Sequence, residues 1–381
     1  MKVVLISLAL LFIVMTVLPV FRHDWWVIRA CDFPRQQIAV AGVLILGGYL
    51  SVFNTHWMET VVLTALAGAV AYQGYWIWPY TPYASVQVVD APEPRPDDRL
   101  SVLVVNVCVH NRDAEALVHE VRRSDPDLLL VLEATPDWAE GLAVLQDAYP
   151  YAVEHTREDP YGIALYARYP LSDASIRFLV DDGIPSVHAT VRLPSGNAVR
   201  FFGLHPRPPH PEEDRDTAHR DAELLLVGHE VERLLEEENQ PVVVAGDFND
   251  VSWSYVTLLM RRVSGLLDPR IGRGPVNTIH TRYPFARCPL DHILHSPHFT
   301  LETLERRPDI GSDHFPLLAR LQLEPEAREV HERPYVDATM RQHAREEIGK
   351  AAWRLRQERS ENGTPAPTTP APAPDPSRHP S

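Results

Sequence analysis

Three apolar stretches occupy the first 83 residues of this 381-residue chain. They cover residues 3–21, 38–53 and 60–78, and none of them contains an Asp, Glu, Lys or Arg. Each is close to the ~20 residues that a helix needs to cross a bilayer, the second being the shortest. Tyr and Trp residues cluster from Tyr72 to Tyr83, as they do at membrane–water interfaces. The pattern predicts three transmembrane helices in residues 1–83 and a multi-pass protein of the cell membrane.

The same stretches have two alternative interpretations. The first could be a cleaved signal peptide, although no small-residue cleavage motif precedes residues 22–26. The second and third could be buried helices of a large core, although the absence of charge in both favours membrane spans.

After Tyr83 the pattern changes to a Pro- and Asp-rich linker at residues 84–99, and then to strands and helices in alternation over residues 100–324. The fully apolar strands, mixed with alternating ones, indicate an α/β fold in which two packed β-sheets are flanked by helices. Strands are predicted at 100–109, 127–133, 162–167, 186–193, 198–205, 241–247, 290–296 and 315–323, and helices at 113–124, 212–238 and from residue 252.

The chain becomes polar again beyond the last predicted strand. Residues 325–360 form a polar, partly helical extension with Arg and Glu on its faces. Residues 361–381 are a low-complexity tail rich in Pro, Ala and Thr, which we expect to be disordered.

The formal net charge of −15 narrows the range of partners. Proteins that bind nucleic acid usually carry a basic face, so nucleic acid is a less favoured partner than a small or lipid-borne substrate. The three cysteines match neither a zinc motif nor a disulfide framework. No protein partner is indicated.

Polar side chains follow or begin six of the predicted strands. Asp247 and Asn249 alone could belong to an ordinary turn. Six strands that deliver acids, amides and imidazoles indicate a site, because strand ends are rigid mounts for reactive groups. The residues are Asn106, Glu133, His205, Asp247, Asn249, Asp291, Asp313 and His314.

These residue types suit phosphoryl transfer with a divalent cation. Glu133 and Asp313 can supply the carboxylate oxygens that Mg²⁺ or Mn²⁺ requires. Asp247 can take a proton from an attacking water. A histidine beside a buried carboxylate is held in one orientation with its cationic form favoured, and Asp291 and His314 would make such a pair. The remaining candidates for phosphate contact, besides His314, are Asn249 and His205.

The sequence resembles the endonuclease/exonuclease/phosphatase superfamily over residues 100–323. The motifs that carry the resemblance are NVCVHNR at 106–112, PDLLLVLE at 126–133, GDFN at 246–249, LDHIL at 290–294 and GSDHFPL at 311–317. The resemblance implies a four-layer α/β sandwich with its active site at one end of the two sheets.

The resemblance also implies roles for individual residues. Glu133 binds the metal, with Asn106 near it and Asp313 on the metal side. Asp247 activates the nucleophile, and Asn249 and His205 contact phosphate. Asp291 and His314 form a pair. The chain departs from the family at Ala167, where many members have Ser, and at residues 277–287, which have little of the Tyr or Trp that nucleases often use there. The apolar stretches resemble a bacterial group in which three helices precede the catalytic domain.

The sequence therefore predicts a membrane-anchored, divalent-metal-dependent phosphohydrolase or phosphodiesterase, with the bilayer as partner and a lipid-linked phosphate as one candidate substrate. A membrane-tethered nuclease and a catalytically inactive scaffold are the alternatives. The loop at residues 22–37 carries Arg22, Arg29 and Arg35 and would share a compartment with the catalytic domain. Basic loops mark the cytoplasmic side, so we expect a cytoplasmic catalytic domain, although Lys2 argues the other way.

Overall fold

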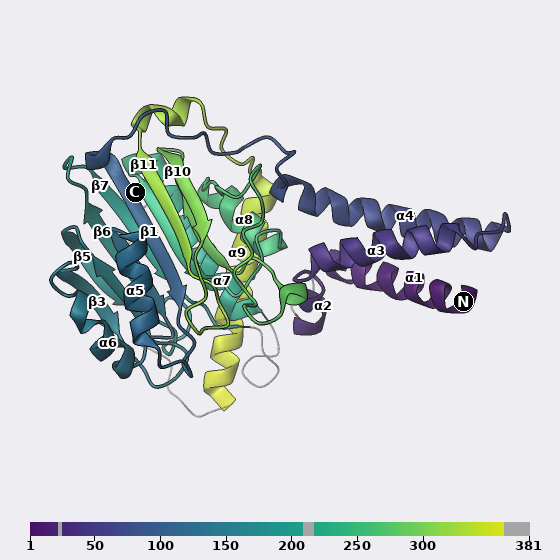
Figure 1. The fold of residues 1–381 in the computed structure, drawn as a ribbon, viewed down its shortest axis with the longest axis horizontal. Coiled ribbons are helices and arrows are strands. Elements are labelled where there is room, and N and C mark those ends of the chain that lie inside the picture. The colour runs from purple at the N-terminus through teal and green to yellow at the C-terminus, as the bar shows by residue number, and fades with distance from the viewer. Residues whose placement is uncertain (22–24, 209–216, 362–381) are drawn as a thin grey trace, which may run out of the picture.

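A computed structural model of the protein describes residues 1–21, 25–208 and 217–361. A bundle of helices projects from a larger α/β domain (Figure 1). Arg22, the beginning of the helix predicted from Glu212 and the predicted tail from residue 362 onward lie outside the described residues.

Two mixed β-sheets form the centre of the α/β domain, with six and five strands in the described part of the chain. Most neighbouring strands are antiparallel, but β1/β2 and β7/β8 are parallel pairs. The first sheet has the order β10 (Phe299–Arg306), β11 (Leu317–Leu323), β1 (Arg99–Asn106), β2 (Leu128–Leu132), β4 (Ile163–Ala167) and β3 (Tyr151–His155). The second has the order β5 (Leu171–Arg177), β6 (Ser186–Arg192), β7 (Ala198–Leu204), β8 (Val242–Asp247) and β9 (Asp291–His295).

The two sheets pack face to face and each is covered by helices. Alternate side chains of both sheets, such as Leu130 and Phe201, form one buried cluster between the sheets. The outer face of the first sheet packs on α5 and α6, and the outer face of the second packs on α7 and α8. This order of layers confirms the predicted fold class. The helices are α5 (Ala114–Ser124), α6 (Pro136–Leu142), α7 (Ala218–Arg233), α8 (Tyr255–Ser264) and, in the polar extension, α9 (Ala338–Glu361).

The projecting bundle consists of α1 (Lys2–Val17), α3 (Arg35–Leu50) and α4 (Trp57–Ile77), with the short α2 (Trp26–Ala30) at the end nearest the α/β domain (Figure 1). Phe12 and Leu66 are buried between the helices. Large apolar side chains on the outside, such as Leu44, are exposed. An apolar outer surface of this kind is typical of a membrane-embedded bundle.

Charged residues of the bundle helices lie only at their ends. Lys2 and Glu59 form an ion pair at the end far from the α/β domain. Arg35 pairs with Asp32 at the near end. The band between these ends is uncharged in α1, α3 and α4.

The predicted three spans are not all supported. Two helical segments, Lys2–Phe21 with 20 residues and Trp57–Tyr80 with 24 residues, are long and apolar enough to cross a membrane by length and composition. The middle helix, α3, has 16 residues. At 1.5 Å per residue it is about 24 Å long, which is shorter than the ~30 Å hydrocarbon core. The apolar stretch at 38–53 extends past the end of this helix, because residues 51–52 already turn.

Residues of the loop between α1 and α3 contact the α/β domain. Arg29 Nη2 lies 3.4 Å from Asp221 Oδ2, and Trp253 Nε1 donates to the backbone oxygen of Asp32 at 2.8 Å. The loop and the α/β domain therefore lie on the same side of the bundle. Arg29 and Arg35, on which the cytoplasmic assignment rests, both have acidic partners, so their presence in the loop has a structural reason besides topology. The cytoplasmic assignment stays a prediction.

Residues 84–98, in the predicted linker, are irregular apart from a short 3-10 helix at Pro96–Asp98, and they lie against the α/β domain. Val88 is fully buried in the cluster between the sheets. The backbone amide of Ala91 donates to the oxygen of Leu301 at 2.9 Å. Gln87 accepts a hydrogen bond from Arg261 at 2.7 Å. The segment therefore fixes the position of the bundle relative to the sheets.

Glu223 of α7 makes the stability of the fold depend on pH. It is buried, and burial, with a smaller contribution from Asp181, raises its pKa to about 8. In the unfolded chain its pKa is about 4.3. Between these values the folded protein holds a proton that the unfolded chain has released, so the free energy of unfolding falls as pH rises through this window and is constant above it.

We therefore expect Glu223→Gln to raise the melting temperature at pH 8 and to leave it nearly unchanged at pH 4. Glutamine stays neutral in both states, so the penalty for ionisation is removed. Thermal unfolding of both proteins across this range measures the effect. A difference in melting temperature that is the same at every pH would contradict the prediction.

Candidate active site

The topology brings the predicted site residues to one end of the two sheets. Asn106 ends β1, and Glu133 follows β2, its parallel neighbour. In the second sheet the parallel pair β7 and β8 places His205 and Asp247 at the same edge. Asp291 begins β9 and pairs with Asp247 in the antiparallel register. Two sheets packed face to face therefore each deliver acids and amides to one place.

Asn106 connects the two sheets. Its Nδ2 donates to Glu133 Oε1 at 3.0 Å and to Asp247 Oδ2 at 3.2 Å. Its Oδ1 accepts from the backbone amide of Cys108 at 3.0 Å. An amide nitrogen is the group that suits a position between two carboxylates. In this arrangement Asn106 holds the two acids together, and its oxygen accepts a hydrogen bond from Cys108.

Glu133 and Asp313 form the donor set that fits a hard divalent cation. Glu133 is half-buried and accepts from the amide of Val109 at 2.7 Å as well as from Asn106. Burial raises its pKa, and the nearby Asp313 adds to the rise. Among the described residues no donor is hydrogen-bonded to the Asp313 carboxylate. Each oxygen of Glu133 accepts one hydrogen bond and keeps a second lone pair, so Glu133 and the neighbouring Asp313 can together attract a cation such as Mg²⁺.

Asp247, Asp291 and His314 form a buried charged cluster. The expected hydrogen bond between Asp291 and His314 is present, with His314 Nδ1 2.8 Å from Asp291 Oδ2. His314 Nε2 lies 3.7 Å from Asp247 Oδ2. Burial opposes charge on the imidazole, but the carboxylates of Asp291 and Asp247 raise its pKa from 6.5 to about 10. Burial also raises the pKa of Asp247, against the effect of His314.

The ligand atoms of this cluster lie within 4.8 Å of one another, which could also suit a metal ion. However, Nδ1 of His314 is already bonded to Asp291, and the raised pKa keeps the ring protonated near neutral pH. A protonated imidazole has no free lone pair for a metal. The cluster is therefore better suited to proton transfer and charge stabilisation than to metal binding. Glu133 and Asp313 are better suited to bind the cation.

His205 and Asn249 lie beside Asp247. Nε2 of His205 is 4.0 Å from Asp247 Oδ2. The backbone amide of Asn249 donates to Asp247 Oδ1 at 2.8 Å, and its side-chain Nδ2 donates to the oxygen of Pro206 at 2.9 Å. An Asx turn at Asp247 is thus present, as the simpler interpretation expects. The same carboxylate still keeps its second oxygen toward Asn106 and the two histidines.

Backbone strain gathers around these side chains. Glu133 and Asn249 have φ values of 59° and 50°, in the left-handed region that non-glycine residues seldom adopt. Gly246 has φ 145°, and a Cβ there would lie 1.9 Å from the backbone oxygen of Leu204. Only glycine fits this approach of β7 to β8. Such strain is typical of functional sites, where the surrounding structure holds it in place.

Arg220 of α7 is a site-supporting residue that the sequence did not reveal. It is buried, and its Nη1 donates to the backbone oxygen of Asn249 at 2.8 Å. Its Nη2 donates to Asp221 Oδ1 at 2.7 Å and lies 3.6 Å from Asp250 Oδ2. It therefore holds the strained peptide of Asn249. Its position in a charged helix gave no signal, since arginine on a helix usually faces solvent.

A cavity of about 590 Å³ opens beside Asp313. Its lining includes four basic or titratable side chains that were not among the predicted site residues: His110, Arg112, His280 and Arg282. They come from the loop after β1 and from residues 280–282. Arg112 pairs with Asp137 at 3.1 Å, whereas Arg282 has no carboxylate within 4 Å among the described residues and brings positive charge to the rim, which suits an anionic substrate.

The sequence model of the Endonuclease/Exonuclease/phosphatase family matches residues 103–314. Among solved structures, an endonuclease/exonuclease/phosphatase from Beutenbergia cavernae is 18% identical, with 60% of this chain and 72% of that chain covered and a TM-score of 0.48. The human Nocturnin catalytic domain with bound sulfate anion is 17% identical, with 61% and 96% covered and a TM-score of 0.48. TDP2 of D. rerio, complexed with a single-strand DNA product, is 20% identical, with 59% and 100% covered and a TM-score of 0.48. A comparison with the curated proteins found no match.

Proposed function

The chain belongs to the Endonuclease/Exonuclease/phosphatase family, and on that premise we propose that it is a membrane-anchored hydrolase of phosphate esters that works with Mg²⁺ or Mn²⁺. Members of this family are phosphoesterases and nucleases. The observation that carries the proposal is the hydrogen-bonded cluster in which Asn106 joins Glu133 of the first sheet to Asp247 of the second, beside the Asp291–His314 pair.

Glu133 and Asp313 would hold the metal ion, which supplies positive charge to the phosphate oxygens. Asn106 would keep Glu133 in place through its Nδ2, because this bond to Oε1 and the bond from the amide of Val109 to Oε2 together fix the orientation of the carboxylate. This role differs from direct ligation, which its oxygen, bonded to Cys108, does not favour.

Asp247 is our candidate for the general base. It is a buried carboxylate with a raised pKa, so it accepts a proton from water more readily than an exposed aspartate does. Asp291 orients His314 so that Nε2 points toward the side of Asp247, where it can donate to a phosphate oxygen. His205 lies on the same side.

Asn249 would contact the phosphate through the second hydrogen of its amide. One hydrogen is already bonded to the oxygen of Pro206, and an amide group has two donors. Arg220 would not contact the substrate itself. It would act through Asn249, because its hydrogen bond to the backbone oxygen of Asn249 fixes the position of that residue.

The position of the site supports a substrate held in the same membrane. Residues 277–287, which carry the rim side chains His280 and Arg282, are hydrogen-bonded to the base of the bundle. Asn277 Nδ2 donates to Gln36 Oε1 at 2.9 Å. Gln37 Nε2 donates to the backbone oxygen of Arg287 at 2.7 Å. Tyr283 and Phe285 of this segment are exposed. Exposed aromatic side chains next to a membrane bundle suit the interface. A lipid-linked phosphate is therefore our preferred substrate class.

A nuclease is the second candidate, favoured by the basic rim of the cavity. The net charge of −15 argues against a long polyanion as substrate. An inactive scaffold is disfavoured, because every acid, amide and imidazole of the predicted set lies at the same end of the sheets.

Metal dependence tests the proposed chemistry. The full chain, purified in detergent, is assayed with Mg²⁺ against phosphomonoesters, phosphodiesters, lipid phosphates and plasmid DNA. Excess chelator should abolish hydrolysis, and added Mg²⁺ or Mn²⁺ should restore it. Glu133→Gln should raise the metal concentration required for half-maximal rate, because one carboxylate ligand is lost. Glu140→Gln, an exposed change in α6, serves as control.

Full activity in excess chelator would overturn the metal-dependent mechanism. Cleavage of plasmid DNA at a rate above that of every lipid phosphate would favour the nuclease over the preferred substrate class.

A further inference from the structure

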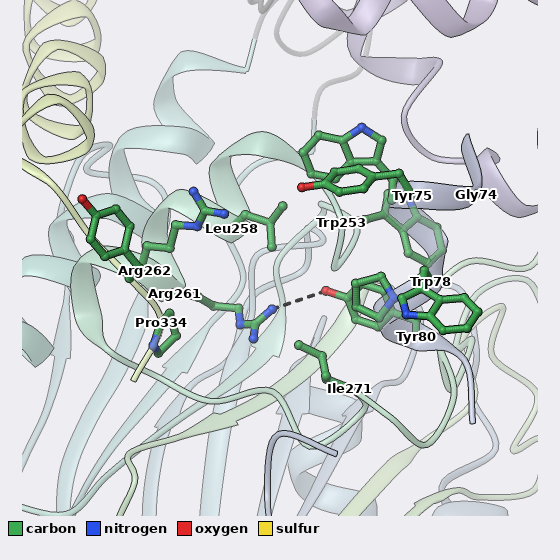
Figure 2. Close-up of a pocket in the computed structure, with 13 residues that line it drawn as sticks. Gly74, Tyr75, Trp78, Tyr80, Trp253, Leu258, Arg261, Arg262, Ile271 and Pro334 are labelled. Carbon is green, nitrogen blue, oxygen red and sulfur yellow. Dashed lines mark hydrogen bonds between the residues drawn. The ribbon is translucent and has the colours of Figure 1, made fainter. Parts of the chain in front are cut away.

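A second cavity, of about 570 Å³, lies where α4 meets the α/β domain. Its volume is within the ~300–1,000 Å³ typical of small-molecule sites. One wall consists of the last turn of α4 and the short helix after it, from Gly74 to Tyr80, and the other consists of α8 and residues near 334 (Figure 2). It is separate from the candidate active site, whose cavity has other lining residues.

The lining of this cavity is mainly aromatic and aliphatic. Tyr80 and Trp253 are buried, with their rings 5.6 Å apart and nearly perpendicular. Tyr80 donates to the oxygen of Ser252 at 2.7 Å, which fixes this part of the wall. At the α4 end, Tyr75 and Trp78 are 70% and 56% exposed. Tyr and Trp with one polar end are enriched at the level of lipid headgroups.

Two arginines of α8 line the cavity, and only one of them is neutralised. Arg261 is buried, donates to Tyr80 and Gln87, and lies 3.8 Å from Asp268. Arg262 is exposed, and among the described residues no carboxylate lies within 4 Å of its guanidinium. Its one hydrogen bond in the described chain goes to the sulfur of Met340, at 3.6 Å.

One acidic group, Asp337, lies near Arg262 without forming an ion pair with it. Asp337 lines an adjacent cavity that shares Arg262, but its Oδ1 caps α9 by accepting from the amide of Met340 at 2.8 Å. An arginine without an ion-pair partner at the edge of an apolar cavity can bind the phosphate of an amphipathic anion.

We infer, on the premise of the proposed membrane anchoring, that this cavity binds one anionic glycerophospholipid from the surrounding bilayer. Its apolar part would lie against the aromatic wall from Gly74 to Trp78, and its phosphate would lie beside Arg262. The site lies at the end of the segment Trp57–Tyr80, where headgroups meet water if this segment spans the membrane. The lipid would bind between the bundle and α8, so it would also reinforce their contact.

Native mass spectrometry of the detergent-purified full chain tests this inference. Phosphatidylglycerol and phosphatidylcholine are titrated separately, and bound lipid is counted. One phosphatidylglycerol should be retained in preference to phosphatidylcholine. Arg262→Gln should weaken its binding about five-fold, as expected for loss of one basic group near an anionic headgroup. Arg123→Gln is the matched control, because Arg123 is also an exposed arginine in the last turn of a helix, α5.

A second variant fills the cavity without changing charge. A Cβ on Gly74 would meet no atom within 4 Å, so Gly74→Phe places a ring in the cavity without a clash at the backbone. This change should also reduce retained phosphatidylglycerol. Equal retention of the two lipids, or retention unaffected by both variants, would overturn the inference.

Vesicle flotation separates this outcome from failure of the proposed function. The wild type and both variants should float with phosphatidylcholine vesicles, because Arg262 lies outside the bundle and Gly74→Phe only adds apolar surface near the end of α4. A wild-type chain that does not float would contradict membrane anchoring itself.

Discussion

Replacement of Asp247 by Asn is expected to lower kcat by about 10²- to 10⁴-fold, the usual contribution of a general base. Asparagine has nearly the same shape, and its Oδ1 can still accept from the amide of Asn249, as the aspartate does at 2.8 Å. The Asx turn is therefore kept while the proton acceptor is lost. The hydrogen bond from Asn106 is also lost, at a cost of ~1 kcal/mol of stability. Steady-state kinetics and thermal unfolding of the same preparations measure both effects.

Asp309→Asn is the matched control for this experiment. The exposed Asp309 makes the same kind of turn, with its Oδ1 accepting from the amide of Gly311 at 2.8 Å. It should retain near wild-type activity. If Asp247→Asn also kept its kcat, the turn would be the whole role of Asp247 and the proposed base would be lost.

Replacement of Arg220 by Met is expected to cost about 3–5 kcal/mol of stability, as does removal of one partner from a buried ion pair. The change leaves Asp221 and Asp250 buried with less compensating charge. A loss of this size corresponds to a fall in melting temperature of roughly 6–20 °C for a domain of this length. At temperatures where the variant is still folded, its kcat should also be lower than that of the wild type, because the strained peptide of Asn249 is no longer held.

Arg233→Met on the same helix shows what a surface ion pair contributes. Arg233 is exposed and pairs with Glu237 and Glu238, so its loss should leave the melting temperature nearly unchanged. Adding Asp250→Asn to Arg220→Met should recover part of the lost stability, because one uncompensated carboxylate is removed. Equal effects of the two arginine changes would show that Arg220 is not a structural support of the site.

The central strands could be predicted from the sequence, whereas three edge strands could not. Strands such as β2 and β8 are buried on both faces and appear as continuous apolar runs. The strands β3, β5 and β10 lie at sheet edges, and most of their residues are at least partly exposed. Their polar side chains weaken the pattern that marks a strand, because an edge has less apolar surface to cover.

The candidate site was predictable where residues sit at strand ends, and not where the fold brings a distant helix to them. The ends of β1, β2, β8 and β9 can be read from the sequence because each follows or begins an apolar run. The contact of Arg220 with Asn249 joins residues 29 positions apart through the packing of α7 on the second sheet. The direction of the Asn106 amide depends on a carboxylate in the other sheet. Neither contact leaves a periodic signal in the sequence.

The prediction for α3 was limited by the same lack of three-dimensional context. Apolar composition alone does not show where a helix ends, and the turn at residues 51–52 shortens it. A helix too short to cross alone can still pack between α1 and α4, since both neighbours cover it.

The rigid junction below the bundle has a consequence for which phosphates the enzyme can reach. The segment before β1 packs against the sheets through Val88. Arg29 pairs with Asp221 of α7, and the backbone oxygen of Asp32 accepts a hydrogen bond from Trp253. With the bundle seated in a bilayer, the catalytic mouth would stand at one height and one tilt above the surface. A catalytic domain joined to its membrane bundle by a flexible linker could reach headgroups of any length. The fixed junction in this protein would instead limit cleavage to phosphates that project from the membrane by a set distance. Chemically identical phosphates that lie deeper or extend further would not be cleaved.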